Sequence, residues 1–156
     1  MNLIQLEEIS YENLDAVIDV YETLTEQDKH HVAPNVVSLA EAYLNYKIAW
    51  PRAIAINKEV IGFVMLSLDN YHADKADHPV YYLWRFMIAN KHQKQGYGKQ
   101  VLDMIVDKCK QDNIRYLYAS CTLKDPMPYS MYINYGFIDT GKEEDSEQIL
   151  KLKIES

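Results

Sequence analysis

The sequence contains no long hydrophobic segment. None of its apolar runs approaches the about 20 residues needed to cross a bilayer, and Met1–Leu3 does not open like a signal peptide. We therefore expect a cytoplasmic protein that does not span a membrane. The 156 residues are 48% hydrophobic and 25% charged, which is typical of a single globular domain covering residues 1–156.

Cysteine and basic residues are scarce. Two cysteines, Cys109 and Cys121, do not make a disulfide framework, and we expect both to be buried thiols. The histidines show no metal-ligand spacing with cysteines or carboxylates, so no metal site is predicted. The net charge of −7 argues against nucleic acid as a partner. It is compatible with a cationic small substrate and equally with simple solubility.

Glycine is also rare, yet two of the five glycines lie one residue apart in Gln93-Lys94-Gln95-Gly96-Tyr97-Gly98. An apolar strand precedes this turn and a helical pattern follows it, so unpaired N–H groups at the helix start could bind an anion. Lys94 and Lys99 flank the turn. A Rossmann fingerprint is not supported because position 101 is Val101, and the G-K-[ST] of a phosphate loop is absent. The alternative is a tight turn without a ligand.

The remaining patterns predict a mixed α+β sheet with helices on both faces. Strands are expected over residues 2–8, 52–56, 60–68, 80–89, 115–121 and 148–154, with a further strand starting at Phe137. Helices are expected from Ser10 to about residue 20, over 37–46, after Gly98 and over 129–134. Gly62, inside a strand, indicates a bulge or a close backbone approach.

Three features occur in one order: an apolar strand with Q-x-x-G-x-G, a second strand, and a short helix ending in Tyr132-Ile133-Asn134-Tyr135-Gly136-Phe137. In this the chain resembles the GNAT superfamily of acetyl-CoA-dependent N-acetyltransferases. The resemblance implies a mixed, mostly antiparallel sheet of six to seven strands, flanked by helices and splayed between strands 4 and 5. Ser38–Tyr43, Gly62–Met65, Leu83–Ile88 and Thr140-Gly141 are similar to segments of bacterial diamine and polyamine acetyltransferases.

The resemblance also implies where acetyl-CoA would bind. The backbone near Phe86 and Ile88 would pair with its pantetheine amides, and a backbone N–H near Met87 would stabilise the oxyanion. The pyrophosphate would bind at Gln93, Lys94, Gln95, Gly96, Tyr97, Gly98 and Lys99. Tyr132 would protonate the leaving thiolate, the alternative being a tyrosine that only packs in its helix.

The chain departs from the family pattern at two positions. Asp125 stands where many relatives carry an asparagine that holds the CoA arm, so it either accepts a hydrogen bond from CoA or only caps the short helix. Trp84-Arg85 supplies no carboxylate where several polyamine enzymes carry one. Candidates for the general base are Glu41, His30, His31 and Tyr129, with a water chain as the alternative. Glu41, Trp84 and Tyr129 are expected on the amine side.

The implied function is transfer of an acetyl group from acetyl-CoA to a primary amine of a small polyamine or diamine, by direct attack in a ternary complex. Alternatives are an antibiotic or peptide amine as the acceptor, or a non-catalytic module that binds acyl-CoA. Cys121 could carry the acyl group, although no histidine is obviously paired with it. Homodimers are common in this family.

Overall fold

The computed structural model describes residues 3–70, 72–123 and 126–155. The chain divides into two compact units, one made of Met1–Ser67 and Trp84–Asp103, the other of Leu68–Leu83 and Met104–Ser156. Strand β4 (Val80–Ile88) and helix α4 (Tyr97–Gln111) each contribute residues to both units. We describe the two units in turn.

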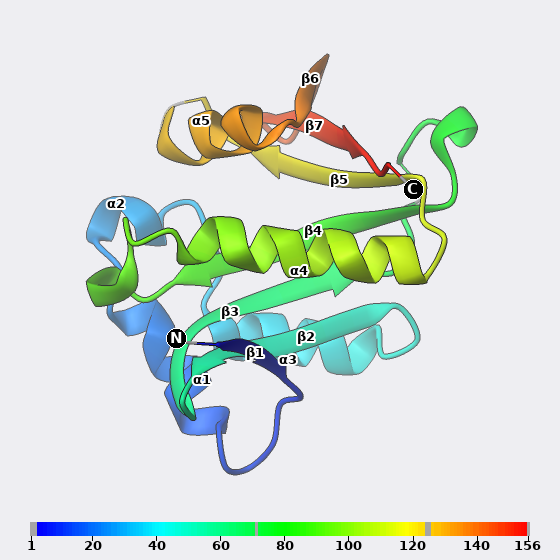
Figure 1. Ribbon diagram of the computed structural model, residues 1–156. Helices are drawn as coiled ribbons and strands as arrows, with labels where there is room; N and C mark the ends of the chain where they lie inside the picture. Colours follow the sequence, from blue (N-terminus) through cyan, green and yellow to red (C-terminus); the bar gives the residue numbers. More distant parts are fainter. Residues whose placement is uncertain (1–2, 71, 124–125, 156) are drawn as a thin grey trace. The chain divides into compact units, whose positions relative to one another are not determined.

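The first unit contains an antiparallel sheet (Figure 1). Strands β1 (Ile4–Glu7), β2 (Ala49–Ile56) and β3 (Glu59–Ser67) pair in that order. Asn57 and Lys58 join β2 to β3 and both have positive φ angles, 50° and 69°. Two positive φ values in a two-residue turn match the right-handed twist of the flanking strands, which favours this tight hairpin.

Gly62 lies at an irregularity in β3. The pairing runs from Ile54 with Gly62 to Ala55 with Val60, so Ile61 is the extra residue of a bulge. A Cβ atom added to Gly62 would lie 2.5 Å from the carbonyl oxygen of Met87. The bulge and the close backbone approach expected from the sequence are therefore both present.

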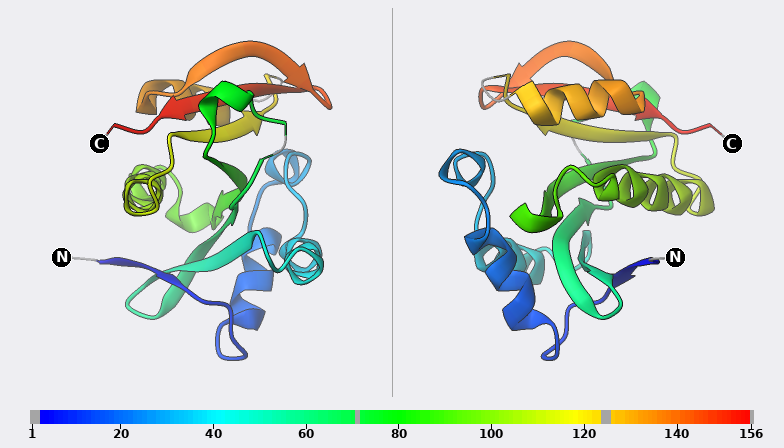
Figure 2. Two further views of the ribbon diagram at one scale, coloured as in Figure 1. Left: turned by 90° about the vertical axis from the view of Figure 1, so that its right-hand side faces the viewer. Right: turned by 60° about the vertical axis from the view of Figure 1, so that its left-hand side comes forward.

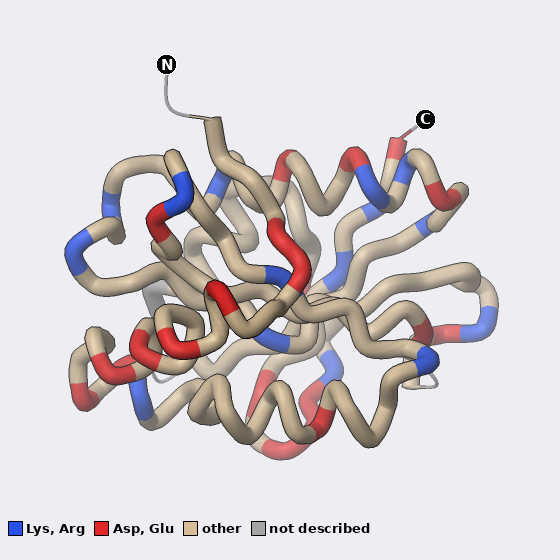
Figure 3. Tube along the Cα trace, turned by 90° about the horizontal axis from the view of Figure 1, so that it is seen from below, with Lys and Arg blue, Asp and Glu red and all other residues tan. Residues whose placement is uncertain are grey.

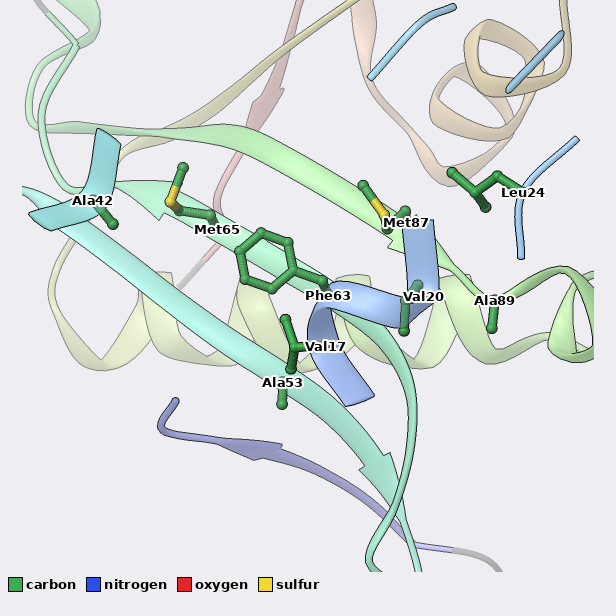
Figure 4. Close-up of a cluster of buried hydrophobic side chains, with 9 residues drawn as sticks. All are labelled: Val17, Val20, Leu24, Ala42, Ala53, Phe63, Met65, Met87 and Ala89. Atoms are coloured by element: carbon green, nitrogen blue, oxygen red, sulfur yellow. The ribbon is translucent and has the colours of Figure 1, made fainter. Parts of the chain in front are cut away.

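Helices α1 (Leu14–Glu22), α2 (Glu26–Lys29) and α3 (Asn35–Leu44) belong to the first unit, where α1 packs on β3 and α3 on β2. Figure 4 shows the buried side chains, which are Val17, Val20, Leu24, Ala42, Ala53, Phe63, Met65, Met87 and Ala89. The Phe63 ring lies near the centre of this cluster and is fully buried. The core therefore joins both helices to the strands that lead toward the predicted cofactor-binding turn.

The second unit contains β5 (Tyr116–Cys121), β6 (Ile138–Glu144), β7 (Glu147–Lys153) and helix α5 (Pro126–Tyr135) (Figure 2). Strand β5 pairs with β4 in parallel over Val80–Tyr82 and Tyr116–Tyr118, and with β7 antiparallel along its whole length. The order of the seven strands is β1-β2-β3-β4-β5-β7-β6. The predicted mixed, mostly antiparallel sheet with flanking helices is confirmed.

Several boundaries differ from the sequence-based expectation. Strand β2 begins at Ala49 instead of Arg52, and β7 begins at Glu147 instead of Gln148. Ser10 was expected to cap α1, but Asn13 is the N-cap residue and its side chain accepts a hydrogen bond from the Ser10 N–H. Both cysteines are free and buried, as predicted. No helix in the described part of the chain is long and apolar enough to span a bilayer.

Candidate active site

The turn from Gln93 to Gly96 leads directly into α4 within the first unit. Lys94 and Gly96 have φ angles of 63° and 84°, and the Gly96 carbonyl accepts a hydrogen bond from Gln100 N–H at 3.3 Å. Gly96 therefore marks the start of the helix, and the N–H groups of its first turn have no partner within the helix. This is the strand–turn–helix arrangement that the sequence predicted.

Two glutamine side chains fix the shape of this turn. Gln93 donates from Nε2 to the Ile88 carbonyl at 2.9 Å, and Gln95 donates from Nε2 to the Lys91 carbonyl at 3.0 Å. A Cβ atom added at Gly96 would meet no atom within 4 Å. Packing therefore does not require a glycine at position 96. The positive φ angle favours one, because glycine adopts this conformation without a steric penalty. The space beside Gly96 is open to a ligand.

Lysines flank the turn on both sides. Lys94 and Lys99 are exposed, and Lys99 lies 3.5 Å from the Asp103 carboxylate one helical turn further on. An exposed pair of this kind is worth little in free energy. Lys99 can therefore exchange this partner for an anionic ligand at small cost.

The end of β4 carries the residues expected to contact the pantetheine arm. The Met87 side chain is buried in the core, whereas Phe86 and Ile88 are only half-buried. Immediately after the strand, the Ala89 N–H donates to the Ile61 carbonyl at 2.7 Å, which ties this end to β3. Any contribution of Met87 to the chemistry must therefore come from its backbone.

Glu41 and Trp84, both expected on the amine side, lie around Arg85. The Arg85 guanidinium is 3.2 Å from Glu41 Oε1 and donates from Nε to Ser38 Oγ at 3.1 Å. It also lies 5.7 Å from the centroid of the Trp84 ring. The Glu41 carboxylate is thus already paired with a cation. His30 and His31, the other candidate bases of this unit, directly follow α2.

Tyr132 lies on α5 in the second unit and is only 7% exposed. Its ring contacts Phe137 with a centroid distance of 5.1 Å. Burial raises the pKa of Tyr132, and the nearby Cys121, Tyr82 and Glu147 raise it further. The hydroxyl therefore remains protonated at neutral pH, as a proton donor requires.

Tyr129 is on the same helix and donates its hydroxyl to Asp139 Oδ2 at 3.0 Å. This hydrogen bond is the main reason that the pKa of Tyr129 is raised. A tyrosine whose neutral form is favoured is a poor proton acceptor at neutral pH, which weakens its candidacy as the base. Asp125, expected near the cofactor arm, lies outside the described residues.

The second unit also contains a cavity of about 360 Å³ that the sequence did not predict. Strands β4, β5, β6 and β7 and the segment before β4 contribute to its lining. Its carboxylates are Asp74, Glu143, Glu144, Asp145 and Glu147, against one lysine and one histidine. The lysine, Lys142, is paired with Asp74 at 3.0 Å, so the lining keeps an excess of negative charge.

Three side chains in this cavity form a continuous hydrogen-bonded chain. The Tyr82 hydroxyl is 2.7 Å from Ser120 Oγ, and Ser120 Oγ donates to Glu147 Oε2 at 3.1 Å. The strand predicted over residues 148–154 leaves out Glu147, which is the first residue of β7 in the structure. The alternation of the strand, extended back by one residue, would have put Glu147 on the same face as Ile149.

Among residues 3–70, 72–123 and 126–155, no cluster of three or more His, Cys, Asp or Glu side chains is arranged to hold a metal ion. Burial raises the pKa of Cys109 to about 12 and that of Cys121 to about 11, in the latter case with help from the Glu147 charge. Thiols with such raised pKa values are poor nucleophiles at neutral pH. Cys121 is therefore a weak candidate for carrying an acyl group.

Solved structures with similar folds include acetyltransferases from several organisms. A PaiA N-acetyltransferase from Thermoplasma acidophilum in complex with coenzyme A is 16% identical, with a TM-score of 0.71 over 97% of this chain and 99% of that one. A GNAT family acetyltransferase from Elizabethkingia anophelis with acetyl-CoA bound is 16% identical, with a TM-score of 0.66 over 97% of each chain. The ribosomal-protein-S18-alanine N-acetyltransferase from Escherichia coli is 15% identical, with a TM-score of 0.69 over 100% of this chain and 96% of that one.

At these identities the similarity to solved structures establishes the fold alone. The family follows from the sequence: residues 14–137 match the model of the acetyltransferase (GNAT) family. That range includes the Gln93–Gly98 turn, Tyr132 and Gly136-Phe137. Because this match covers most of the chain, the protein belongs to the acetyltransferase (GNAT) family and is an acetyl-CoA-dependent N-acetyltransferase.

Proposed function

We propose that this enzyme acetylates a primary amine of a small polyamine or diamine, by direct attack of the amine on acetyl-CoA in a ternary complex. The acidic cavity of the second unit is the observation that carries the choice of a cationic acceptor. Five carboxylates line it, and Figure 3 shows Asp and Glu residues in many parts of a chain whose net charge is −7. Such a field raises the local concentration of cations.

In this proposal the turn before α4 binds the pyrophosphate. The backbone N–H groups of Gln95–Lys99 hold its oxygens, Gln93 keeps the turn in shape, and Lys94 adds positive charge. The backbone of Phe86 and Ile88 pairs with the pantetheine amides as an added strand would. The open space beside Gly96 and the unpaired N–H groups of the first helical turn support this assignment.

The chemistry proposed for the acyl transfer is a single displacement. The amine nitrogen forms a bond to the thioester carbonyl carbon, and the oxygen that gains charge accepts a hydrogen bond from the Met87 backbone N–H. The C–S bond then breaks and the thiolate takes a proton from Tyr132. The place of Tyr132 in the signature with Gly136-Phe137, within the residues that match the family model, supports this role.

Glu41, Trp84 and Tyr129 are proposed as further contacts of the amine substrate. A distal ammonium could share the Glu41 carboxylate with Arg85, and the Trp84 ring offers a face for a cation. Tyr129 could accept a hydrogen bond from an ammonium while it donates to Asp139. If Asp125 contacts the cofactor, it does so as an acceptor.

Two other acceptors remain as alternatives. An aminoglycoside is also polycationic and would suit an acidic lining. A protein or peptide amine is favoured by the shared fold of the Escherichia coli alanine N-acetyltransferase.

An amine panel tests the proposal. Purified protein with acetyl-CoA is offered spermidine, spermine, putrescine, an aminoglycoside and a short peptide, and the release of free thiol is followed. We expect the highest kcat/KM with one of the three polyamines. A clear preference for the peptide or the aminoglycoside would replace the proposed acceptor, and the absence of turnover with all three polyamines would reject it.

A further inference from the structure

We propose that Glu147 is the catalytic proton acceptor for the substrate ammonium, and that Ser120 and Tyr82 position its carboxylate. This inference rests on the amine acetylation proposed above. It names a residue for the role of general base, which neither the Gln93–Gly98 motif nor the helices of the first unit provide. Glu147, Ser120 and Tyr82 all belong to the second unit.

The strand register places the three residues together. Ser120 on β5 pairs with Ile149 on β7, so Glu147, two residues from Ile149, projects from the same face of the sheet as Ser120. Tyr82 of β4 pairs with Tyr118, which is also two residues from Ser120. All three side chains line the same cavity. Three neighbouring strands therefore deliver one carboxylate and two hydroxyls to one wall.

The hydrogen bonds in this wall have a fixed direction. An ionised carboxylate can only accept, so the single Ser120 proton is directed to Glu147 Oε2. Tyr82 must then donate to Ser120 Oγ across their 2.7 Å separation. Both hydroxyl protons thus point toward Glu147. This arrangement holds one carboxylate oxygen in place and fixes the orientation of the group.

The charges around Glu147 favour a substrate cation as its partner. On the segment before β4, Asp74 pairs with Lys142 at 3.0 Å, and His72 lies 3.9 Å from Glu144. The remaining carboxylates of β6 and of the adjoining turn are Glu143 and Asp145. On β5, Tyr118 donates to Asp77, outside the cavity lining. The two basic side chains of the cavity are thus associated with other carboxylates.

Glu147 is also close enough to the proposed acid to affect it. Its negative charge contributes to the raised pKa of both Tyr132 and Cys121. Tyr132 on α5 and Glu147 on β7 both belong to the second unit. The proposed acid and the proposed base therefore come from the same unit.

The candidates proposed from sequence fit this role less well. Glu41 is already paired with Arg85 at 3.2 Å, so a proton on it would break an existing ion pair. Tyr129 favours its neutral form, as described above. Glu147 has a hydroxyl donor on one oxygen and lines a cavity rich in carboxylates, where a protonated substrate amine would gather.

The proton balance is simple. The ammonium loses one proton to Glu147, and the free amine attacks the thioester. As the amide forms, Tyr132 gives its proton to the departing thiolate, and the nitrogen of the tetrahedral intermediate loses a second proton that restores the Tyr132 hydroxyl. Overall, two protons leave the nitrogen: one replaces the proton that Tyr132 gave to coenzyme A, and the other reaches solvent from Glu147.

Glu147→Gln tests the proposal through the pH dependence of kcat with the best amine of the panel. The side chain stays nearly isosteric but can no longer accept the proton, so kcat at pH 7 should fall about 100-fold. The defect should shrink as the pH rises toward 10, because solvent then supplies the free amine. The difference in kcat between Glu147→Gln and the wild type should also be smaller with a fluorinated analogue of the same amine, because that analogue is less basic and needs no proton acceptor. Glu147→Asp should retain part of the activity.

Glu143→Gln is the matched control, since it removes the same charge from the same cavity. We expect it to raise KM and to leave the pH dependence of kcat as in the wild type. If Glu147→Gln behaves like Glu143→Gln, or if its defect is constant between pH 7 and 10 while its melting temperature is unchanged, Glu147 is not the base. Loss of activity in Tyr132→Phe with a normal profile in Glu147→Gln would reject this inference alone. Lack of turnover by the wild type would reject the proposed function.

Discussion

The backbone of Gly62 passes so close to Met87 that a Cβ atom at position 62 would lie 2.5 Å from the Met87 carbonyl oxygen. The same Cβ would also contact Ile54 and Ile88 side chains at 3.1 Å. Gly62→Ala should therefore push β3 and β4 apart and lower the free energy of unfolding by about 2 kcal/mol. Urea denaturation measures this loss.

The same substitution should reduce kcat, because the Met87 backbone is the proposed oxyanion donor. Gly141→Ala is a suitable control: its Cβ would meet no atom within 4 Å, so it introduces backbone strain without a clash. We expect Gly141→Ala to be the milder variant in both measurements. Equal stability of Gly62→Ala and wild type would show that β4 adjusts freely at Met87.

Gly96→Val separates cofactor binding from folding. Position 96 has a φ of 84° and open space around an added Cβ, so the substitution costs about 1–2 kcal/mol of backbone strain. The valine methyls would occupy the space assigned to the pyrophosphate. Affinity for acetyl-CoA, measured by calorimetry, should fall at least tenfold.

Gly141→Val imposes the same kind of strain, at a φ of 78° and again in open space. It belongs to the second unit, whereas the turn before α4 belongs to the first. Its affinity for acetyl-CoA should match that of the wild type. If both variants bind acetyl-CoA normally, the pyrophosphate assignment is wrong.

Tyr132→Phe removes the proposed proton donor and keeps the ring that packs on Phe137. We expect normal acetyl-CoA affinity and a kcat reduced about 100-fold, in line with general acid catalysis. Tyr135→Phe removes a hydroxyl from the same helix and should retain turnover. Steady-state kinetics of both variants decides the matter, and equal rates would leave Tyr132 with a packing role.

Because the pKa of Tyr132 is raised, the wild type should not lose activity at the pH where an ordinary tyrosine ionises. We expect kcat to fall on the basic side only above about pH 10. A pH profile of kcat checks this, and a decline centred near pH 8 would point to another donor.

Asp77 predicts how the stability of the second unit depends on pH. Burial alone would raise the pKa of Asp77, but hydrogen bonds from Lys151 at 2.8 Å and Tyr118 at 2.6 Å outweigh it and hold the pKa below the ordinary value. A carboxyl with a lowered pKa in the folded state stabilises the fold at neutral pH. That stabilisation should disappear as the pH falls below about 4.

Asp77→Asn should therefore lower the free energy of unfolding at pH 7 by about 2 kcal/mol, since it leaves the half-buried Lys151 ammonium without its charge partner. The difference from wild type should narrow in acid, where the wild-type carboxyl is also neutral. As a control, Glu22→Gln removes the exposed carboxylate that pairs with Lys29, and it should change the free energy of unfolding little. Urea titrations at several pH values test this, and a difference that is independent of pH would contradict it.

The sequence predicted the order of elements well because periodicity and turn residues are local signals. The strand predicted over residues 52–56 begins after Pro51, yet Pro51 pairs with Met65 in the structure. Strand β1 covers β2 only from Ala53 to Ile56, so Pro51 lies where β2 has no neighbour on its other side. Proline has no backbone N–H, and this is tolerated at the edge of a sheet. Whether position 51 lies at an edge depends on where β1 ends, and β1 is far from Pro51 in the sequence.

The proposed cofactor turn and Tyr132 were likewise accessible from local motifs. The acidic cavity was not, because its wall depends on the register between strands that are far apart in the sequence. Residues 82, 120 and 147 share no motif, and their proximity follows only once β4, β5 and β7 are paired. The ion pair that occupies Glu41 joins residues 44 positions apart and was equally invisible.

The hairpin between β6 and β7 closes through Asp145 and Ser146, whose φ angles are both positive, 50° and 67°. Glu144 and Glu147, on either side of this bend, line the acidic cavity. Substitutions or insertions in a surface bend are tolerated far more readily than changes in a core. If the cavity binds the amine as proposed, evolution or an engineer can change which amine is accepted by altering a few residues of this bend, without altering the proposed cofactor-binding turn.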